Sequence, residues 1–228
     1  MKTSNKLLIT LFVVGLLTLV GANVALRAEY DQIDFKNPFY GLSTQKIQPF
    51  RVLKLEGDKT GVGLLSVQTG NTFEIHLPDK SKHQFTYQSN GDTLTIRYRP
   101  ENGAGKSRPS YSFTSSPAAV IVAPALEALY TTQISCSLNK VETGNLVLVQ
   151  KNAGVLLSNS TIGNLTVSNT EGSDLHTRAI NQIKTAQITA SDSSTVLVER
   201  DIFGSLTLET DSLTTVKLPG GLLKKLRQ

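Results

Sequence analysis

Few residues in this chain of 228 could do acid–base or metal chemistry: three histidines and a single cysteine. Asp174 and His176 are two residues apart in an alternating apolar stretch. On a β-strand they would share one face, where a carboxylate could orient an imidazole base. No nucleophile or further acid falls in register beside them, as a catalytic constellation requires. His76, His83 and Cys136 show no metal-ligand spacing. We therefore expect no catalytic, cofactor-binding or metal-binding residues.

A glycine-rich stretch raises a second chemistry, phosphate binding. Gly103–Ser107 reads Gly-Ala-Gly-Lys-Ser and resembles the end of a phosphate-binding loop. The first glycine of that motif would fall at Pro100, and no strand–helix frame surrounds it. We interpret the stretch as part of a surface loop.

The single cysteine excludes an internal disulfide framework. Cys136 falls in register with Leu156 and Leu175 of the repeat described below, which places it inward. A buried thiol behaves as a small hydrophobe, so we expect Cys136 to be inert.

Three residues next to inward positions form a candidate interaction surface: Leu157, His176 and Leu197. They align at intervals of 19 and 21 residues, and outward leucines in such a row could contact another chain. Scattered exposed leucines are also ordinary on protein surfaces, so both readings stay open. Beside this row, Arg178 aligns with Glu199, which predicts a surface ion pair.

A repeat of about 20 residues must position all these side chains. It is visible in apolar residues at successive equivalent positions: Leu148, Val167, Ile188 and Leu208. A second set follows eight residues later: Leu156, Leu175, Val196 and Val216. Period-2 alternation at this repeat length suits one coil of a β-solenoid, in which stacked coils bury the inward face together. We therefore predict an all-β fold, a single-stranded parallel β-helix with about 20 residues per coil.

The same spacing continues upstream, where Leu53, Phe73 and Leu94 are 20 and 21 residues apart. A Gly-, Pro- and Ser-rich stretch interrupts it and reads as a long loop. The expected divisions are an N-terminal signal-anchor helix at 1–27, a tether at 28–46, an N-terminal β segment at 47–99, a loop at 100–117, solenoid repeats at 118–219 and a C-terminal cap at 220–228.

The N-terminus carries a nearly continuous apolar run from Leu7 to Leu26, the length a helix needs to cross a bilayer. Lys2 and Lys6 precede the run and acidic residues follow it, so the positive-inside rule leaves the N-terminus in the cytoplasm. We expect a single-pass protein of the cell membrane with its body extracytoplasmic. A cleaved signal peptide is the alternative and would make the body secreted or periplasmic.

The net charge of +5 comes from the chain ends. Cations flank the N-terminal apolar run or crowd the C-terminus, which leaves the body close to neutral. A nucleic-acid-binding protein needs a basic stripe on its folded face, so we expect no nucleic-acid partner.

The order of these features resembles a known family. An opening strand at Phe50–Gly57 is followed by Gly91–Ile96, by an apolar strand into Ala123–Leu126, and by repeats that open with Gly-Asn-Leu at Gly144 and Gly163. This pattern resembles the GIN-domain family, whose members are described as auto-transporter adhesin heads of bacterial envelope proteins. The resemblance covers roughly residues 46–219. It implies a β-helical envelope domain without established catalytic residues.

Three hypotheses about function follow. The first is a non-enzymatic, membrane-anchored module for adhesion or binding in the bacterial envelope, with a glycan or an envelope protein as ligand. The second is a carbohydrate-active β-helix enzyme, which would need acids clustered over adjacent coils. The third is a self-assembling structural protein of the envelope. No such acid cluster falls in register on neighbouring coils, so we expect the first.

Overall fold

The computed structural model describes residues 3–34, 39–58, 64–99, 113–114 and 116–225. They form two compact units, Met1–Gly41 and Leu42–Gln228. The predicted loop at 100–117, with the Gly103–Ser107 stretch, falls mostly outside the described residues.

The first unit holds one long helix, α1 (Thr3–Asp31). It has a mean hydropathy of 2.4 in its most apolar window, and none of that window is buried within the protein. Its polar side chains bond along the helix: the Thr10 hydroxyl donates to the Lys6 carbonyl, and the Asn23 amide donates to the Leu19 carbonyl. α1 is thus long and apolar enough to cross a membrane.

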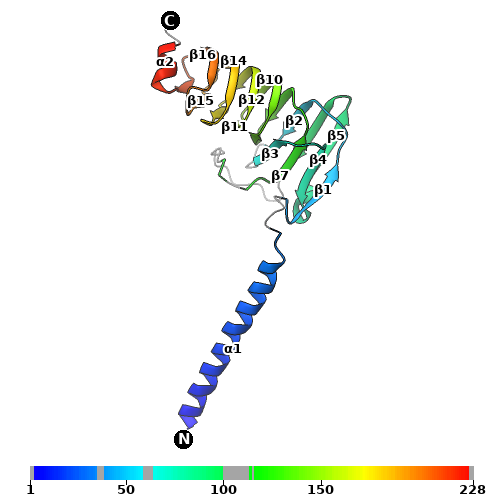
Figure 1. The fold of residues 1–228 in the computed structure, drawn as a ribbon, viewed down its shortest axis with the longest axis vertical. Helices are drawn as coiled ribbons and strands as arrows, with labels where there is room; N and C mark the ends of the chain where they lie inside the picture. The colour runs from blue at the N-terminus through cyan, green and yellow to red at the C-terminus, as the bar shows by residue number, and fades with distance from the viewer. Residues whose placement is uncertain (1–2, 35–38, 59–63, 100–112, 115, 226–228) are drawn as a thin grey trace. The chain divides into compact units, whose positions relative to one another are not determined.

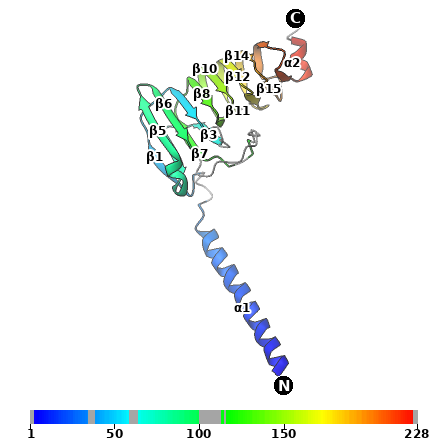
Figure 2. The same ribbon diagram turned by 180° about the vertical axis from the view of Figure 1, so that it is seen from behind.

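The second unit contains two large sheets within the described part of the chain (Figures 1 and 2). The nine-stranded sheet has the order β1 (Leu42–Lys46), β4 (Glu74–Pro78), β7 (Ala119–Ala123), β3 (Leu64–Thr69), β9 (Ser135–Asn139), β11 (Gly154–Ser158), β13 (Asp174–Thr177), β15 (Thr195–Val198), β17 (Thr215–Lys217). The eight-stranded sheet has the order β16 (Phe203–Thr210), β14 (Gln182–Ala190), β12 (Thr161–Thr170), β10 (Glu142–Lys151), β8 (Ala128–Thr132), β2 (Val52–Glu56), β6 (Thr93–Tyr98), β5 (Phe85–Asn90).

The prediction of a single-stranded parallel β-helix is wrong. Both sheets are mixed, because β1 pairs antiparallel with β4, β4 with β7, and β5 with β6. From β8 onward the pairs are parallel and their partners lie about one sequence repeat apart. The aliphatic rhythm of the N-terminal strands is compatible with several pairings, and it did not reveal the antiparallel ones.

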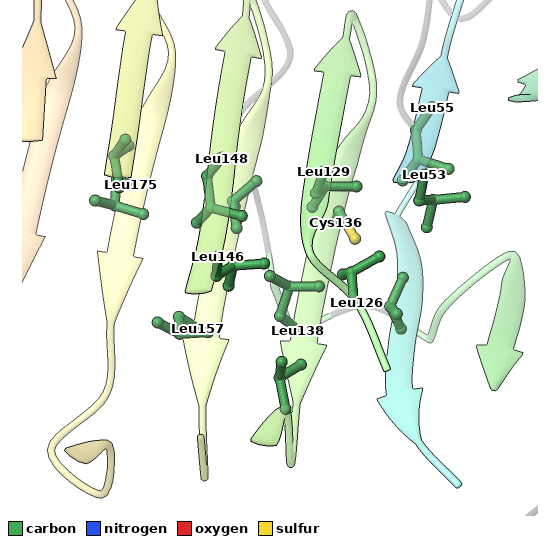
Figure 3. Close-up of a cluster of buried hydrophobic side chains, with 14 of the residues drawn as sticks. Leu53, Leu55, Leu126, Leu129, Cys136, Leu138, Leu146, Leu148, Leu157 and Leu175 are labelled. Carbon is green, nitrogen blue, oxygen red and sulfur yellow. The ribbon is translucent and has the colours of Figure 1, made fainter. Parts of the chain in front are cut away.

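The core lies between the two sheets and is built from rows of aliphatic side chains. Val167 pairs with Leu148 on one side and with Ile188 on the other, and each of these three is at most 1 % exposed. The row continues through Leu208, as the repeat predicted. Figure 3 shows Leu146, Leu148 and Leu157 pointing into this apolar layer. Burial of one such side chain stabilises the fold by about 1.5–3 kcal/mol.

The corners between the sheets use left-handed residues. Gln133, Asn152, Glu171 and Asp192 each follow a strand of the eight-stranded sheet, and each has a φ between 46° and 58°. Asn and Asp tolerate this conformation because their short polar side chains bond locally. At the opposite corner the Asn181 side chain accepts a hydrogen bond from the Ser160 N–H and donates to the Leu157 carbonyl. These contacts join successive repeats without a disulfide.

The C-terminal end of the second unit carries a short helix, α2 (Gly220–Lys225). Its Leu222 is 1 % exposed and belongs to the core, where Leu206 and Leu208 also pack. Lys225 forms an ion pair with Asp201. This helix therefore covers apolar side chains of the last repeat.

Candidate functional site

The predicted surface row lies on the face of the nine-stranded sheet that points away from the core. Its members in register are Leu156, His176 and Leu197. Leu157 is fully buried and lies in the core with Leu138 (Figure 3). The structure thus replaces Leu157 by Leu156 in this row.

One extra residue in the turn before β13 explains why Leu156, and not Leu157, belongs to this row. Two residues separate β10 from β11, whereas three separate β12 from β13. Lys151 therefore pairs with Thr170, but past the turn Val155 pairs with Leu175. Because side chains alternate along a strand, a slip of one residue exchanges the inward and outward faces.

His176 is held by a neighbouring carboxylate. Its Nε2 lies 2.9 Å from Oε1 of Glu199, and Arg178 Nη1 donates to the same oxygen at 3.0 Å. The Ala179 N–H donates to Glu199 Oε2 at 3.2 Å, and the Phe113 ring lies edge-on to His176 with centroids 6.2 Å apart. The predicted Arg178–Glu199 pair is confirmed.

Two carboxyl groups beside His176 have opposite shifts in pKa. Partial desolvation acts to raise the pKa of Glu199, but hydrogen bonds from His176 and Ala179 and the Arg178 charge outweigh it and lower that pKa. Burial raises the pKa of Asp174, although His176 and Lys217 oppose the shift through their charges. The cluster therefore has the chemistry of a charge network that stabilises adjoining strands.

Two of the remaining titratable candidates, Cys136 and His76, are buried, whereas His83 is exposed. Cys136 is wholly inaccessible, as predicted, and burial raises the pKa of its thiol far above the usual range. His76 is 3 % exposed, its Nδ1 lies 3.0 Å from the Thr44 hydroxyl, and burial lowers its pKa against the opposing charge of Glu74. In the described ranges, no group of three or more His, Cys, Asp or Glu side chains could hold a metal ion.

The outer face of the eight-stranded sheet, which the sequence analysis did not single out, has a different character. One row crosses all eight strands in register, and it is mostly polar: Gln88, Thr95, Lys54, Tyr130, Val149, Ser168, Thr189 and Glu209. Asn145 and Asn164 belong to a parallel row, where the Asn164 amide donates to the Asn145 side-chain oxygen at 2.9 Å. This face thus presents hydroxyl, amide and charged groups at strand spacing.

A groove of about 450 Å³ lies on this face over β2, β6 and β8. Its lining is Val52, Lys54, Leu55, Glu56, Thr93, Tyr130 and Thr132. We call it the Tyr130 groove. Tyr130 is 38 % exposed, and the Lys54 ammonium lies 5.8 Å from the centroid of its ring. Arg97 Nε is 2.6 Å from Glu56 Oε2, which holds that carboxylate in place.

The alternation of Tyr130 with buried Leu129 and Thr131 was readable from the sequence and places its ring outward. The sequence did not reveal which residues flank Tyr130 in the sheet, because β8 lies between β10 and β2, and β2 comes much earlier in the chain. The pairing of Tyr130 with Lys54 exists only in the folded sheet.

The chain was compared with known proteins. No family model and no curated protein matches it, so the resemblance to the GIN-domain family stays a prediction. Solved structures with some likeness include a candidate adhesin of Bacteroides fragilis (14 % identity, TM-score 0.41, 77 % of this chain and 95 % of that one). Another is a candidate lipid-binding protein of Parabacteroides distasonis (10 % identity, TM-score 0.34, 77 % and 92 %). A third is a candidate cell adhesion protein of Clostridium sporogenes (9 % identity, TM-score 0.27, 77 % and 97 %). At these values the function must be argued from the residues of this chain.

Proposed function

We propose that this chain is a non-enzymatic adhesion or binding protein of the bacterial cell envelope. α1 anchors it in the membrane as a single span, and the β unit lies outside the cytoplasm. The observation that carries the proposal is the polar outer face of the eight-stranded sheet with its Tyr130 groove. Open polar faces of repetitive β folds are suited to recognition of extended ligands.

The charges around α1 support the topology. Lys2 and Lys6 lie at the N-terminal end, and Glu29, Asp31 and Asp34 lie at or just after the C-terminal end. Cytoplasmic flanks carry the excess of Lys and Arg, so the chain leaves the cytoplasm after α1. Cleavage after the apolar run would release the same body into the periplasm or the medium.

The arrangement around His176 supports a role other than catalysis. Its imidazole is engaged by Glu199, which also receives Arg178 and a backbone N–H. A general base needs to reach a substrate proton from within a pocket. Here the imidazole belongs to an ion-pair network on the outer face of the sheet, which is an expected surface feature of adjoining strands.

A phosphatase fusion after residue 40 tests the topology. An enzyme that is active only outside the cytoplasm should be active in this fusion, because the positive N-terminal flank stays inside. A cytoplasmic reporter fused at the same position should be inactive. The reverse pattern would refute the membrane arrangement.

Binding is tested with the full chain in lipid nanodiscs and with isolated bacterial envelope material. The loaded nanodiscs should retain that material, and empty nanodiscs should not. Release of reducing sugar ends from envelope polysaccharide by the wild type would favour the enzyme hypothesis instead. Concentration-dependent growth of the particles without added envelope would favour self-assembly.

A further inference from the structure

We propose that the Tyr130 groove is a binding subsite for an acidic sugar ring within an extended glycan. This inference rests on the proposed binding function and names its site and its ligand class. The groove combines an exposed aromatic ring, a lysine ammonium that has no ion-pair partner among the described residues, and a fixed carboxylate within a shallow hollow.

The Tyr130 ring supplies the apolar surface. It stands outward from β8, with Lys54 beside it on β2 and Val149 beside it on β10. A pyranose ring has C–H groups on its faces and hydroxyl groups around its edge. The faces can pack on an aromatic ring, since such rings combine a large apolar surface with little loss of side-chain freedom.

Polar groups suited to the hydroxyl edge line the same groove. The hydroxyls of Thr93 and Thr132 can each donate and accept a hydrogen bond. The Glu56 carboxylate accepts from Arg97 and keeps further acceptor sites for a sugar hydroxyl. Because the ion pair already orients this carboxylate, binding orders fewer groups.

The charge of the proposed ligand is inferred from Lys54. The two nearby arginines are already paired, Arg51 with Glu127 at 3.2 Å and Arg97 with Glu56 at 2.6 Å. Among the described residues Lys54 forms no ion pair, and its contact is with the Tyr130 ring. An ammonium beside an aromatic ring fits a sugar that carries a carboxylate, in which a charge-assisted hydrogen bond accompanies ring packing.

The shape of the face points to a chain of sugars. A second hollow of about 130 Å³ lies over β5 and β6 of the same sheet, lined by Thr86, Tyr87, Gln88, Thr95 and Arg97. β6 contributes to both hollows, through Thr93 to the first and through Thr95 and Arg97 to the second. An extended ligand crossing β8, β2, β6 and β5 would contact both.

The experiment uses the full chain in lipid nanodiscs and isothermal titration calorimetry. The acidic probes are hexagalacturonate and a hyaluronan hexasaccharide, and cellohexaose is the neutral probe. We expect an acidic probe to bind more tightly than cellohexaose, with a preference that weakens as salt screens Lys54. Tyr130→Ala should weaken binding by about tenfold, the scale of one lost aromatic contact.

Two variants serve to separate the roles. Lys54→Gln should lower the affinity for the acidic probe to that for cellohexaose, which removes the preference. Tyr40→Ala is the matched control, because this tyrosine is 47 % exposed and lies in the other unit; it should change nothing. The proposal is overturned if neither acidic probe binds, or if Tyr130→Ala and Lys54→Gln bind like the wild type.

Periodate treatment of the envelope material distinguishes this glycan proposal from the broader proposal of a binding function. Periodate cleaves vicinal diols of sugars and leaves most protein surfaces intact. Loss of retention after treatment supports a glycan ligand. Retention that survives periodate but is lost on protease treatment would overturn the glycan proposal and keep the binding function, whereas no retention of untreated material would overturn both.

Discussion

The strands from β8 onward and the strands before it build the same two sheets in different ways. In the later region, residues 128–217, each strand from β10 onward pairs in parallel with the equivalent strand of the preceding repeat, as Val167 does with Leu148. In the earlier region, residues 42–123, most neighbours in a sheet are distant in sequence, and the β5–β6 hairpin is the exception. Leu53 pairs with Leu94 on one side and with Leu129 on the other.

This difference shows that the alternation of aliphatic residues specifies little of the order of strands in a sheet. Both regions contain strands that alternate buried and exposed positions, and both contribute fully buried residues such as Ile96 and Ile188. A regular repeat makes the nearest equivalent strand the best partner. Without that regularity, β1, β4 and β5 pair antiparallel, and both sheets become mixed.

Paired core truncations, one in each region, test whether the two behave as one cooperative unit. Ile188→Ala and Ile96→Ala should each lower the free energy of unfolding by about 2–5 kcal/mol, because both side chains are fully buried. The exposed Thr166→Ala should cost under about 0.5 kcal/mol. Urea unfolding followed by circular dichroism measures all three, with one transition expected. Two separate transitions, each sensitive to one truncation, would show that the regions unfold independently.

The seam between the regions depends on a close backbone approach. The Gly57 N–H donates to the Thr132 carbonyl at 2.8 Å, and a Cβ on Gly57 would overlap the Gln133 carbonyl. Gly57→Ala should therefore destabilise the protein by about 1–3 kcal/mol through a forced backbone shift. Gly144→Ala is the matched control, because a Cβ there meets nothing within 4 Å. Equal unfolding midpoints for the two variants would contradict a tight seam.

The buried His76 gives the earlier region a response to acid. Burial lowers the pKa of His76 below its ordinary 6.5, so the folded earlier region binds this proton less well than the unfolded chain. This contribution is fully present above pH 6.5 and is lost as pH falls through the lowered pKa, at no more than about 1.4 kcal/mol per pH unit. His76→Asn should flatten the dependence of unfolding free energy on pH between 7 and 5. An unchanged slope would remove His76 from the acid response.

In the later region, the two carboxyl groups beside His176 should change the stability of the fold with pH in opposite directions. The pKa of Glu199 is lowered, so its stabilising contribution is present above its ordinary pKa of 4.5 and is lost as pH falls through the lowered pKa. Glu199→Gln should therefore lower the free energy of unfolding by up to about 1 kcal/mol at pH 7. The pKa of Asp174 is raised, so the folded state favours its protonated form and loses stability as pH rises through that pKa. Asp174→Asn should therefore be slightly stabilising at pH 7 and neutral near pH 3. Thermal unfolding of both variants at the two pH values checks the signs, and a shared sign would contradict the opposed environments.

Several features were predictable because they depend on neighbours in sequence. The apolar run Leu7–Leu26 lies within α1. The row through Val167 and Ile188 faces the core, and Cys136 is buried. Each rests on local period and composition, which are properties of the chain itself.

The features that only the tertiary structure decided depend on which strands, distant in sequence, lie side by side in the folded sheets. The extra residue in the turn before β13 moved Leu157 into the core, since a slip of one residue reverses the faces of a strand. The Tyr130 groove exists because β2 lies between β6 and β8, which brings Lys54, Thr93 and Tyr130 together. Alternation along the sequence placed the row through Val167 and Ile188 inward, but it did not decide which face of β11 would be buried. The choice of strand partners followed from turn lengths and from which sheet edges the rest of the fold left open, and these are set only when the whole chain packs.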